Sequence, residues 1–205
     1  MYVPGHFKVK DEKEVWEFIK EHSFGILVTT ENGKPIATHL PFQLVEDEED
    51  YYLSSHMALG NQQWKSFEQN EQVLVIFPGP HSYISSSWYK EVNAPTWNYQ
   101  SVHVYGSLRV IETDELRNDL SSLLEKYEKH RENGVLWGNT SPKGFENQMK
   151  GVVGFKIKIE ELQAAYKLSQ NRTDEDYKNI IENLKKEGST DAEQMAKILA
   201  KQREV

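Results

Sequence analysis

Cysteine is absent from the 205 residues of this chain. The protein therefore has no disulfide, no thiolate nucleophile, no cysteine-ligated zinc and no iron–sulfur cluster, and it suits a reducing compartment. Apolar runs of about 18 residues, which a membrane helix needs, are also missing. Residues 1–7 show neither the basic nor the apolar part of a signal peptide. We therefore expect a cytoplasmic protein without a membrane partner.

Positive charge is in short supply as well. The chain has 24 Lys and Arg against 32 Asp and Glu, which gives a formal net charge of −8. Non-specific affinity for DNA comes mostly from Lys and Arg that displace counterions from phosphates, so broad attraction to DNA is not expected. A direct contact with DNA would therefore need a local basic patch. The alternative is an indirect effect on transcription.

The motifs of several enzyme classes are missing too. The chain has no G-x-G-x-x-G after a strand, no G-x-x-x-x-G-K-[ST], and no G-x-S-x-G frame around its run of serines at 85–87. None of the seven histidines lies in an H-E-x-x-H or similar arrangement. The sequence therefore marks no catalytic residue and no metal site, and it favours a role other than catalysis.

Aromatic residues are plentiful, with five Trp and ten Tyr, and short apolar segments alternate with turns. Asn32-Gly33 favours a tight hairpin, and Asp11, Thr113, Thr173 and Thr190 each precede or begin a helical pattern. The patterns predict strands at 24–30, 35–45, 51–56, 72–77, 101–111 and 151–159, helices at 12–22, 60–67 and 113–131, two terminal helices, and loops at 78–100 and 133–148.

Strands joined by short turns indicate an antiparallel sheet that closes into a barrel. We therefore predict a mainly β fold with flanking helices. The barrel domain would occupy residues 1–172, and a C-terminal helical appendage would occupy residues 173–205.

Two segments have the features of an anion site. Residues 54–64 end a strand and open a helix with small, hydrogen-bonding side chains, and free N–H groups at a helix start attract phosphate. Residues 167–172 place Arg172 directly before the helix that Thr173 caps, where a guanidinium can grip a phosphate. The alternative is that both segments only form caps and turns.

Residues 81–99 combine flat aromatic side chains with polar ones. Their rings can stack on a planar ligand, pack across a subunit boundary, or simply pin the loop in place. In the predicted strand 35–45, His39 falls on the more polar face.

Seven motifs, in order along residues 1–172, resemble the PaiB family. They are M-Y-x-P-x-H-F at the start, T-H-L-P-F (38–42), H-M-A-x-x-N-x-Q-W (56–64), H-x-Y-I-S-x-S-W-Y (81–89), P-T-W-N-Y-x-x-V-H-V-Y-G (95–106), K-G-V-V-G-F (150–155) and K-L-S-Q-N-R (167–172). Leu59, Gly60 and Gln62 stand where the family pattern leads us to expect Arg, Ala and Pro.

The resemblance implies an FMN-binding split β-barrel of the pyridoxamine-phosphate-oxidase-like kind, a homodimer with ligand sites between subunits. It also implies a repressor, a negative transcriptional regulator of protease synthesis and sporulation. The alternatives are an FMN-dependent oxidoreductase and a haem-binding or haem-degrading protein.

The ligand expected from the resemblance and the two anion segments is a small planar molecule that carries phosphate, with FMN as the cofactor. The residues expected to bind it form two walls. The first holds His39, Ser54, Ser55, His56, Asn61, Gln63 and Trp64, and the second holds Tyr83, Ser85, Trp97, Asn98, His103, Ser169, Gln170, Asn171 and Arg172.

Overall fold

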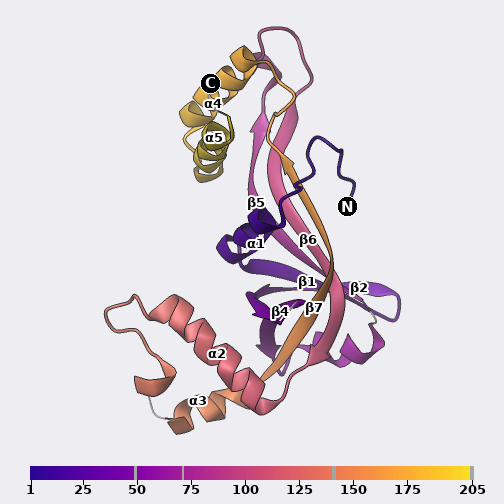
Figure 1. Ribbon diagram of the computed structural model, residues 1–205, viewed down its shortest axis with the longest axis vertical. Helices are drawn as coiled ribbons and strands as arrows, with labels where there is room; N and C mark the ends of the chain where they lie inside the picture. Colours follow the sequence, from indigo (N-terminus) through magenta and orange to yellow (C-terminus); the bar gives the residue numbers. More distant parts are fainter. Residues whose placement is uncertain (49, 71, 140–141, 204–205) are drawn as a thin grey trace. The chain divides into compact units, whose positions relative to one another are not determined.

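The computed structural model of the chain describes residues 1–48, 50–70, 72–139 and 142–203 (Figure 1). Its contacts divide the chain into two compact units, which are described separately. Unit 1 comprises Met1–Phe18, Phe77–His103 and Gln163–Val205; unit 2 comprises Ile19–Ile76 and Val104–Leu162.

The N-terminal third follows the sequence prediction closely. Asp11 caps helix α1 (Glu12–Glu21) by accepting a hydrogen bond from the Lys13 amide at 2.9 Å. Strands β1 (Phe24–Glu31) and β2 (Lys34–Pro41) form an antiparallel hairpin. Asn32 and Gly33 both have positive φ, 52° and 79°, as a type I′ turn requires.

The predicted strand 35–45 is divided in the structure. It breaks at Phe42 into β2 and β3 (Gln43–Asp47), and β3 pairs with β4 (Asp50–Ala58) instead of with β1. Alternation alone gives no sign of this change of partner. A 3₁₀ helix, η1 (Gln62–Gln69), then takes the place of the predicted helix at 60–67.

The prediction of a long loop at 78–100 is wrong. Strand β5 runs from Val73 to Ile84 and β6 from Thr96 to Val110, so only residues 85–95, with the short helix η2 (Ser86–Trp88), lie outside strands. Pro78 and Pro80 are tolerated because β5 pairs with β1 only over Leu74–Ile76, and a strand without a neighbour on one side needs no N–H there.

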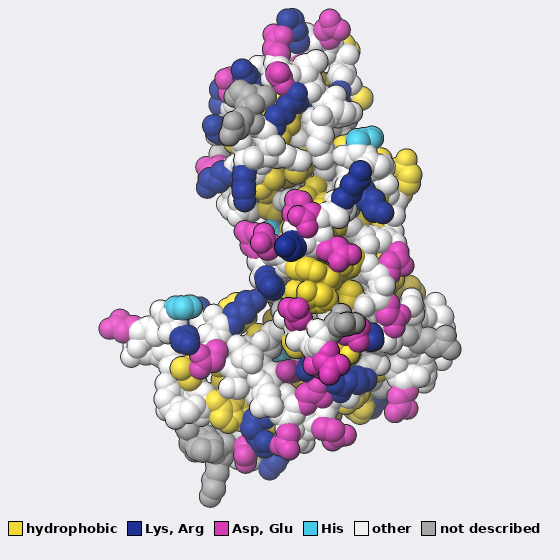
Figure 2. Space-filling view, viewed as in Figure 1, with side chains coloured by type: hydrophobic (Ala, Val, Ile, Leu, Met, Phe, Trp, Pro, Cys, Tyr) yellow, Lys and Arg dark blue, Asp and Glu magenta, His cyan; other side chains and the backbone are white. Residues whose placement is uncertain are grey.

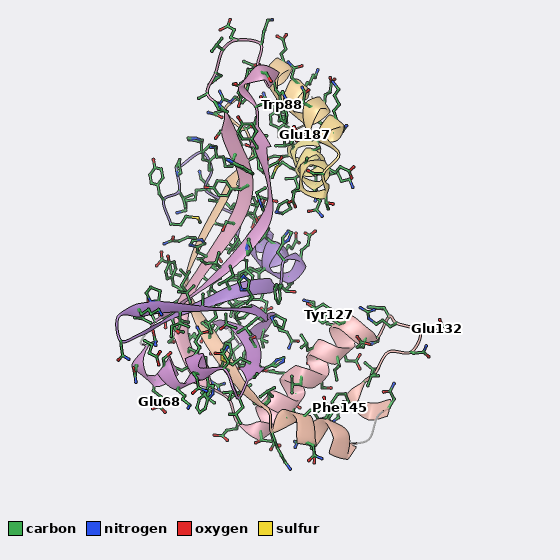
Figure 3. The ribbon with its side chains drawn as sticks, turned by 180° about the vertical axis from the view of Figure 1, so that it is seen from behind. Glu68, Trp88, Tyr127, Glu132, Phe145 and Glu187 are labelled. Carbon is green, nitrogen blue, oxygen red and sulfur yellow. The ribbon has the colours of Figure 1, made fainter. Side chains whose placement is uncertain are left out.

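Helices cover the next segment. Helix α2 (Thr113–Glu128) begins one residue earlier than a cap at Thr113 would give, because its N-cap is Glu112, whose side chain makes no capping bond. The predicted loop 133–148 contains η3 (Trp137–Asn139) and α3 (Pro142–Met149), which is a second correction. The ring of Phe145, which Figure 3 labels on α3, stacks on that of Trp137 at 4.9 Å between centroids.

The C-terminal elements are a long strand and two helices. Strand β7 (Val152–Lys167) extends well beyond the predicted 151–159. Thr173 caps α4 (Asp174–Glu187) by accepting from the Asp176 amide, as predicted. The last helix, α5 (Thr190–Gln202), is capped by Ser189 and not by Thr190.

Together the strands form one seven-stranded sheet in the order β2-β1-β5-β6-β7-β4-β3. Although they are not neighbours in this order, β2 and β4 contact each other, and the Ser55 hydroxyl donates to the Pro41 carbonyl at 2.7 Å. This contact curls the sheet of unit 2 into the predicted barrel. Its core is apolar and fully buried at Leu27, Leu53, Val75, Val104, Phe155 and Ile157.

Unit 1 has a core of its own. The α4–α5 pair buries Tyr177, whose hydroxyl donates to the Leu199 carbonyl at 3.0 Å, together with Ile180 and Leu184. The division predicted at residue 172 stays a prediction, since residues 173–205 belong to the same compact unit as residues 1–18 and 77–103. None of the described helices is both long enough and apolar enough to cross a bilayer.

At Gly106, β6 lies against the backbone of β7 with no room for a side chain. A Cβ atom there would lie 1.8 Å from the Lys158 carbonyl oxygen, which is backbone and has no freedom to turn aside. We expect Gly106→Ala to lower the free energy of unfolding by about 2–3 kcal/mol, measured by urea denaturation. Gly138→Ala, where nothing lies within 4 Å of the new atom, should change it by less than about 0.5 kcal/mol. Equal stability of the two variants would contradict this account.

Candidate functional site

The polar residues of the β4–η1 segment in unit 2 point in different directions. Along β4, Ser54 and Ser55 lie on opposite faces, as successive strand residues must. Ser55 bonds to Pro41 within the barrel, whereas the Ser54 hydroxyl donates to the Asp119 carboxylate on α2. Both serines are buried and both hydroxyls serve the fold.

Gln63 is the centre of a buried hydrogen-bond network. Its side chain is 2% exposed, and its amide nitrogen donates to the Thr29 hydroxyl at 3.0 Å and to the carbonyls of Leu27 and Ile36 at 3.4 and 3.3 Å. The Thr38 hydroxyl donates to its amide oxygen at 2.5 Å. Gln63 thus fastens η1 to the β1–β2 hairpin.

The side chains of Asn61 and Trp64 are also hydrogen-bonded within the protein. The side-chain amide nitrogen of Asn61 donates to the Thr38 hydroxyl at 3.0 Å, and the side-chain oxygen of Asn61 caps η1 by accepting from the backbone N–H of Gln63. The Trp64 indole donates to the Leu59 carbonyl at 3.0 Å. The first predicted wall is therefore largely an internal scaffold.

The two histidines of this wall are in different surroundings. His39 is exposed on β2, where its ring stacks on Phe24 at 6.2 Å between centroids. His56 is half-buried on the Ser54 face of β4, and burial lowers the pKa of its imidazole below the usual range. A lowered pKa favours the neutral ring near pH 7.

An ion-pair network, absent from the predicted site, lies next to Ser54. The Arg109 guanidinium of β6 meets Glu115 of α2 in a bidentate pair at 2.8 and 2.9 Å. Lys156 of β7 lies 2.8 Å from Glu115 and 3.8 Å from Asp119. The hydrogen bond from Arg109, with further help from Lys156 and against the effect of burial, lowers the pKa of Glu115 to about 2. The network holds α2 against the sheet of unit 2.

The second predicted wall lies in unit 1, and its aromatic residues share one face. The alternation of buried residues in β5 shifts by one position at Pro78–Gly79, which is typical of a bulge. After the shift His81 and Tyr83 point outward, and both meet Trp97 of β6, at 6.1 and 5.8 Å between ring centroids. Tyr83 is 45% exposed and Trp97 53%.

His103 lies further along β6 on the same side as Trp97. Its Nδ1 is buried and has no hydrogen-bond partner among the described residues. Burial, followed by the positive charge of the chain's N-terminus, lowers its pKa. We call His81, Tyr83, Trp97 and His103 the aromatic face. The exposed rings of Tyr83 and Trp97 are suited to stacking on a planar molecule.

The other residues of the second wall are engaged with one another. Asn98 is fully buried and exchanges hydrogen bonds with the Ser169 hydroxyl at 3.0 and 3.2 Å, and Ser169 has a positive φ of 59°. The Gln170 side chain bonds to the backbone at Leu168 and Tyr166. Ser85 caps η2, and Asn171 is exposed.

Arg172 faces an aromatic ring instead of open solvent. Its guanidinium lies over the Tyr89 ring, 4.5 Å from the centroid. Beside it, Lys90 binds the start of α4 through Glu175 and Asp176. Figure 3 shows Trp88 of the same loop beside the α4–α5 pair.

Two further findings concern sites that the sequence did not mark. A groove of about 450 Å³ in unit 2 lies among Ile111, Leu116, Met149 and Gly154, with Arg117, Glu146 and Lys150 also lining it. None of the residues predicted to bind a ligand lines this groove. Within the part of the chain that the structure describes, no three His, Asp or Glu side chains gather as a metal site would require.

The arrangement of the strands defines the class of protein. Two solved structures share it at low sequence identity. The FAD and heme binding protein from Mycobacterium smegmatis has a TM-score of 0.63 at 14% identity, over 82% of this chain and 78% of that one. The flavocytochrome from Azotobacter vinelandii also has a TM-score of 0.63, at 16% identity over 86% and 78% of the two chains. The fold is a split barrel of the flavin-binding type, as predicted.

Sequence comparison identifies the family. A family model described as "Putative FMN-binding domain" matches residues 1–161. The protein "Protease synthase and sporulation protein PAI 2" of Bacillus subtilis is 57% identical over 199 residues, which cover 97% of this chain and 96% of that protein. An uncharacterized Saccharomyces cerevisiae protein is 31% identical over 65% of this chain and 94% of its own length. The chain belongs to the PaiB family of proteins with this FMN-binding-type domain.

Gln63 and Gln62 are adjacent glutamines in different surroundings and provide a matched test of the scaffold. Gln63→Ala removes the buried hydrogen bonds to the Thr29 and Thr38 hydroxyls and to two carbonyls and leaves a cavity, so we expect a loss of about 2–4 kcal/mol in the free energy of unfolding. The Gln62 side chain is exposed and donates to the Gly60 carbonyl, so its replacement by alanine should cost less than about 0.5 kcal/mol. Chemical denaturation of both variants would test this, and a similar loss in both would refute the role given to Gln63.

The Glu115 network predicts a pH dependence of stability. Because the folded pKa of about 2 lies below the ordinary value of 4.5, the carboxylate stabilises the fold above about pH 4.5, and this stabilisation is lost as the pH falls toward 2. Glu115 is 28% exposed, so we expect about 1–2 kcal/mol after solvent screening. Glu115→Gln should remove that part of the pH dependence between pH 5 and 3, as followed by urea denaturation. Glu125→Gln, an exposed control on the same helix, should keep the wild-type curve, and parallel curves for Glu115→Gln and wild type would contradict the assignment.

Proposed function

We propose that this chain regulates protease synthesis and sporulation as a cytoplasmic homodimer, and that a flavin-type ligand bound to its split barrel controls this activity. The observation that carries the proposal is the identity of 57% to the Bacillus subtilis protein, which covers nearly the full length of both chains. An alignment of that extent includes the barrel, the aromatic face and both terminal helices together.

The aromatic face provides the elements needed for the ring of FMN. Tyr83 and Trp97 offer exposed faces for stacking. Beside them, His103 holds a buried Nδ1 that has no hydrogen-bond partner among the described residues. When bound, FMN supplies electron-transfer and hydride chemistry, while the protein supplies binding and orientation. The chain's own groups fit the ring, and this fit supports FMN as the ligand class.

The charges of the chain favour an indirect route to transcription. Residues 173–205 carry six Lys or Arg against eight Asp or Glu, and a DNA-binding helix would need an excess of the former. On the face shown in Figure 2, the two signs of charge alternate over the terminal helices and form no basic stripe. We therefore propose that regulation proceeds through another protein and not through direct contact with an operator.

The proposal predicts the outcome of a complementation experiment. In Bacillus subtilis that lacks its PAI 2 protein, expression of this chain should restore the wild-type level of extracellular protease activity. Trp97→Ala should fail to do so, because it removes the largest exposed ring of the aromatic face. Val92→Ala, at a fully exposed position in the nearby loop, should restore the level as the wild type does.

Two measurements on purified protein complete this test. Trp97→Ala should lower FMN affinity at least tenfold with an unchanged melting temperature, while added haem should give no Soret shift. A gel-shift titration at low salt should show no retardation of the regulated promoters. Failure of the wild-type chain to complement would refute the regulatory proposal, and retardation at low salt would refute the indirect route.

A further inference from the structure

We infer that the groove between α2, α3 and the start of β7 binds a medium-chain carboxylic acid, for which decanoate is the probe. All residues that line this groove belong to unit 2, and the site is independent of the proposed function. Three features carry the assignment. They are an apolar floor, a cation at the rim, and a volume that suits a small molecule.

Two helices and two strand ends build the groove, and Figure 1 shows α2 and α3 beside the start of β7. The lining residues of the helical side are Thr113, Leu116 and Arg117 on α2, and Glu146, Met149 and Lys150 on α3 and directly after it. Each set has the spacing i, i+3, i+4, which brings side chains to one face of a helix. The end of β6 and the start of β7 form the other side.

The floor of the groove is apolar. Ile111, Leu116 and Met149 form it, and each is only 6–7% exposed. Gly154 lies against the first two, since a Cβ atom there would come within 2.7–2.9 Å of their side chains. None of the three side chains carries an N–H or O–H group, so water gains little from this floor. An apolar chain is therefore the better occupant.

The charged groups of the groove lie at the rim formed by the helices. The Arg117 guanidinium lies 2.6 Å from the Asp114 carboxylate and 3.7 Å from that of Glu146, so its charge is already compensated. Lys150 is exposed and donates to the Asn147 side chain at 3.2 Å. Among the described residues no carboxylate forms an ion pair with it. A ligand with an apolar chain and one carboxylate complements both the floor and this ammonium group.

The size of the groove decides between a small molecule and a protein partner. Its volume is about 450 Å³, within the range of pockets that enclose small ligands. Eleven residues line it, whereas a stable protein–protein interface engages about 20–30 residues on each side. One acyl chain with its head group is therefore the occupant that we assign.

Methyl NMR of the full-length protein, labelled at its methionine methyl groups and titrated with decanoate, tests where the acid binds. The Met149 signal, assigned with Met149→Leu, should shift and saturate because Met149 is part of the floor. Met57 and Met195 are buried and do not line the groove, so their signals should stay in place. Shifts confined to Met57 or Met195, or no shift at any methionine, would overturn the inference.

Dissociation constants from calorimetry separate the contributions of chain and head group. Octanoate should bind about tenfold more weakly than decanoate, because each buried methylene contributes about a factor of four. Decanoate should bind about threefold more tightly than decanol in 50 mM salt near pH 7, as an exposed ion pair contributes. Equal affinity of the two acids would contradict the apolar floor as the binding surface, and equal affinity of decanoate and decanol would contradict the role of the cation.

Three variants with exposed side chains locate the head group and the chain. Lys150→Gln should abolish the preference for decanoate over decanol. Lys129→Gln, which removes an exposed cation at the end of α2 outside the groove, should keep it. Val110, at the edge of the groove, is 50% exposed, and Val110→Ser should weaken both ligands about threefold. A preference that survives in Lys150→Gln, or unchanged binding by Val110→Ser, would place the ligand elsewhere and overturn the inference.

Discussion

The hydrogen bonds that the buried side-chain amide of Gln63 requires hold unit 2 together. The Gln63 side chain is almost fully buried, and a polar group in that position destabilises the fold unless it is hydrogen-bonded. Its bonds to Thr29, Thr38 and two carbonyls fix η1 against the hairpin. The Gln63 side chain is therefore part of the scaffold that joins η1 to the barrel.

In unit 1, polar side chains lie buried while large aromatic rings lie exposed. Asn98 and Ser169 satisfy each other in the interior, whereas Tyr83 and Trp97 lie in solvent. Large exposed rings on adjacent strands are unfavourable in a monomer and commonly mark a binding surface. The bulge at Pro78–Gly79 in β5 turns the Tyr83 ring outward, toward Trp97 of β6. Regular alternation along β5 would have left Tyr83 in the core.

Several Lys and Arg side chains of this protein form ion pairs that connect its own elements. Arg109, Glu115 and Lys156 tie α2 to the sheet, and Lys90 ties the loop after η2 to α4. Several of the chain's cations are thereby neutralised at short range. Together with the net charge of −8, this use of Lys and Arg limits the attraction of the described surface for polyanions.

The sequence by itself determined the class of fold, the turn at Asn32-Gly33, the caps at Asp11 and Thr173, and the family, because these depend on residues close together in the chain. Only the tertiary structure decided that β5 and β6 extend into the first expected loop, that η3 (137–139) and α3 (142–149) occur in the second, and that Ser54, Asn61 and Gln63 are already bonded. Hydrogen-bond donors look alike in a sequence whether they are free or taken. Their partners, Asp119, Thr38 and Thr29, lie 23 to 65 residues away, so only folding shows which donors remain for a ligand.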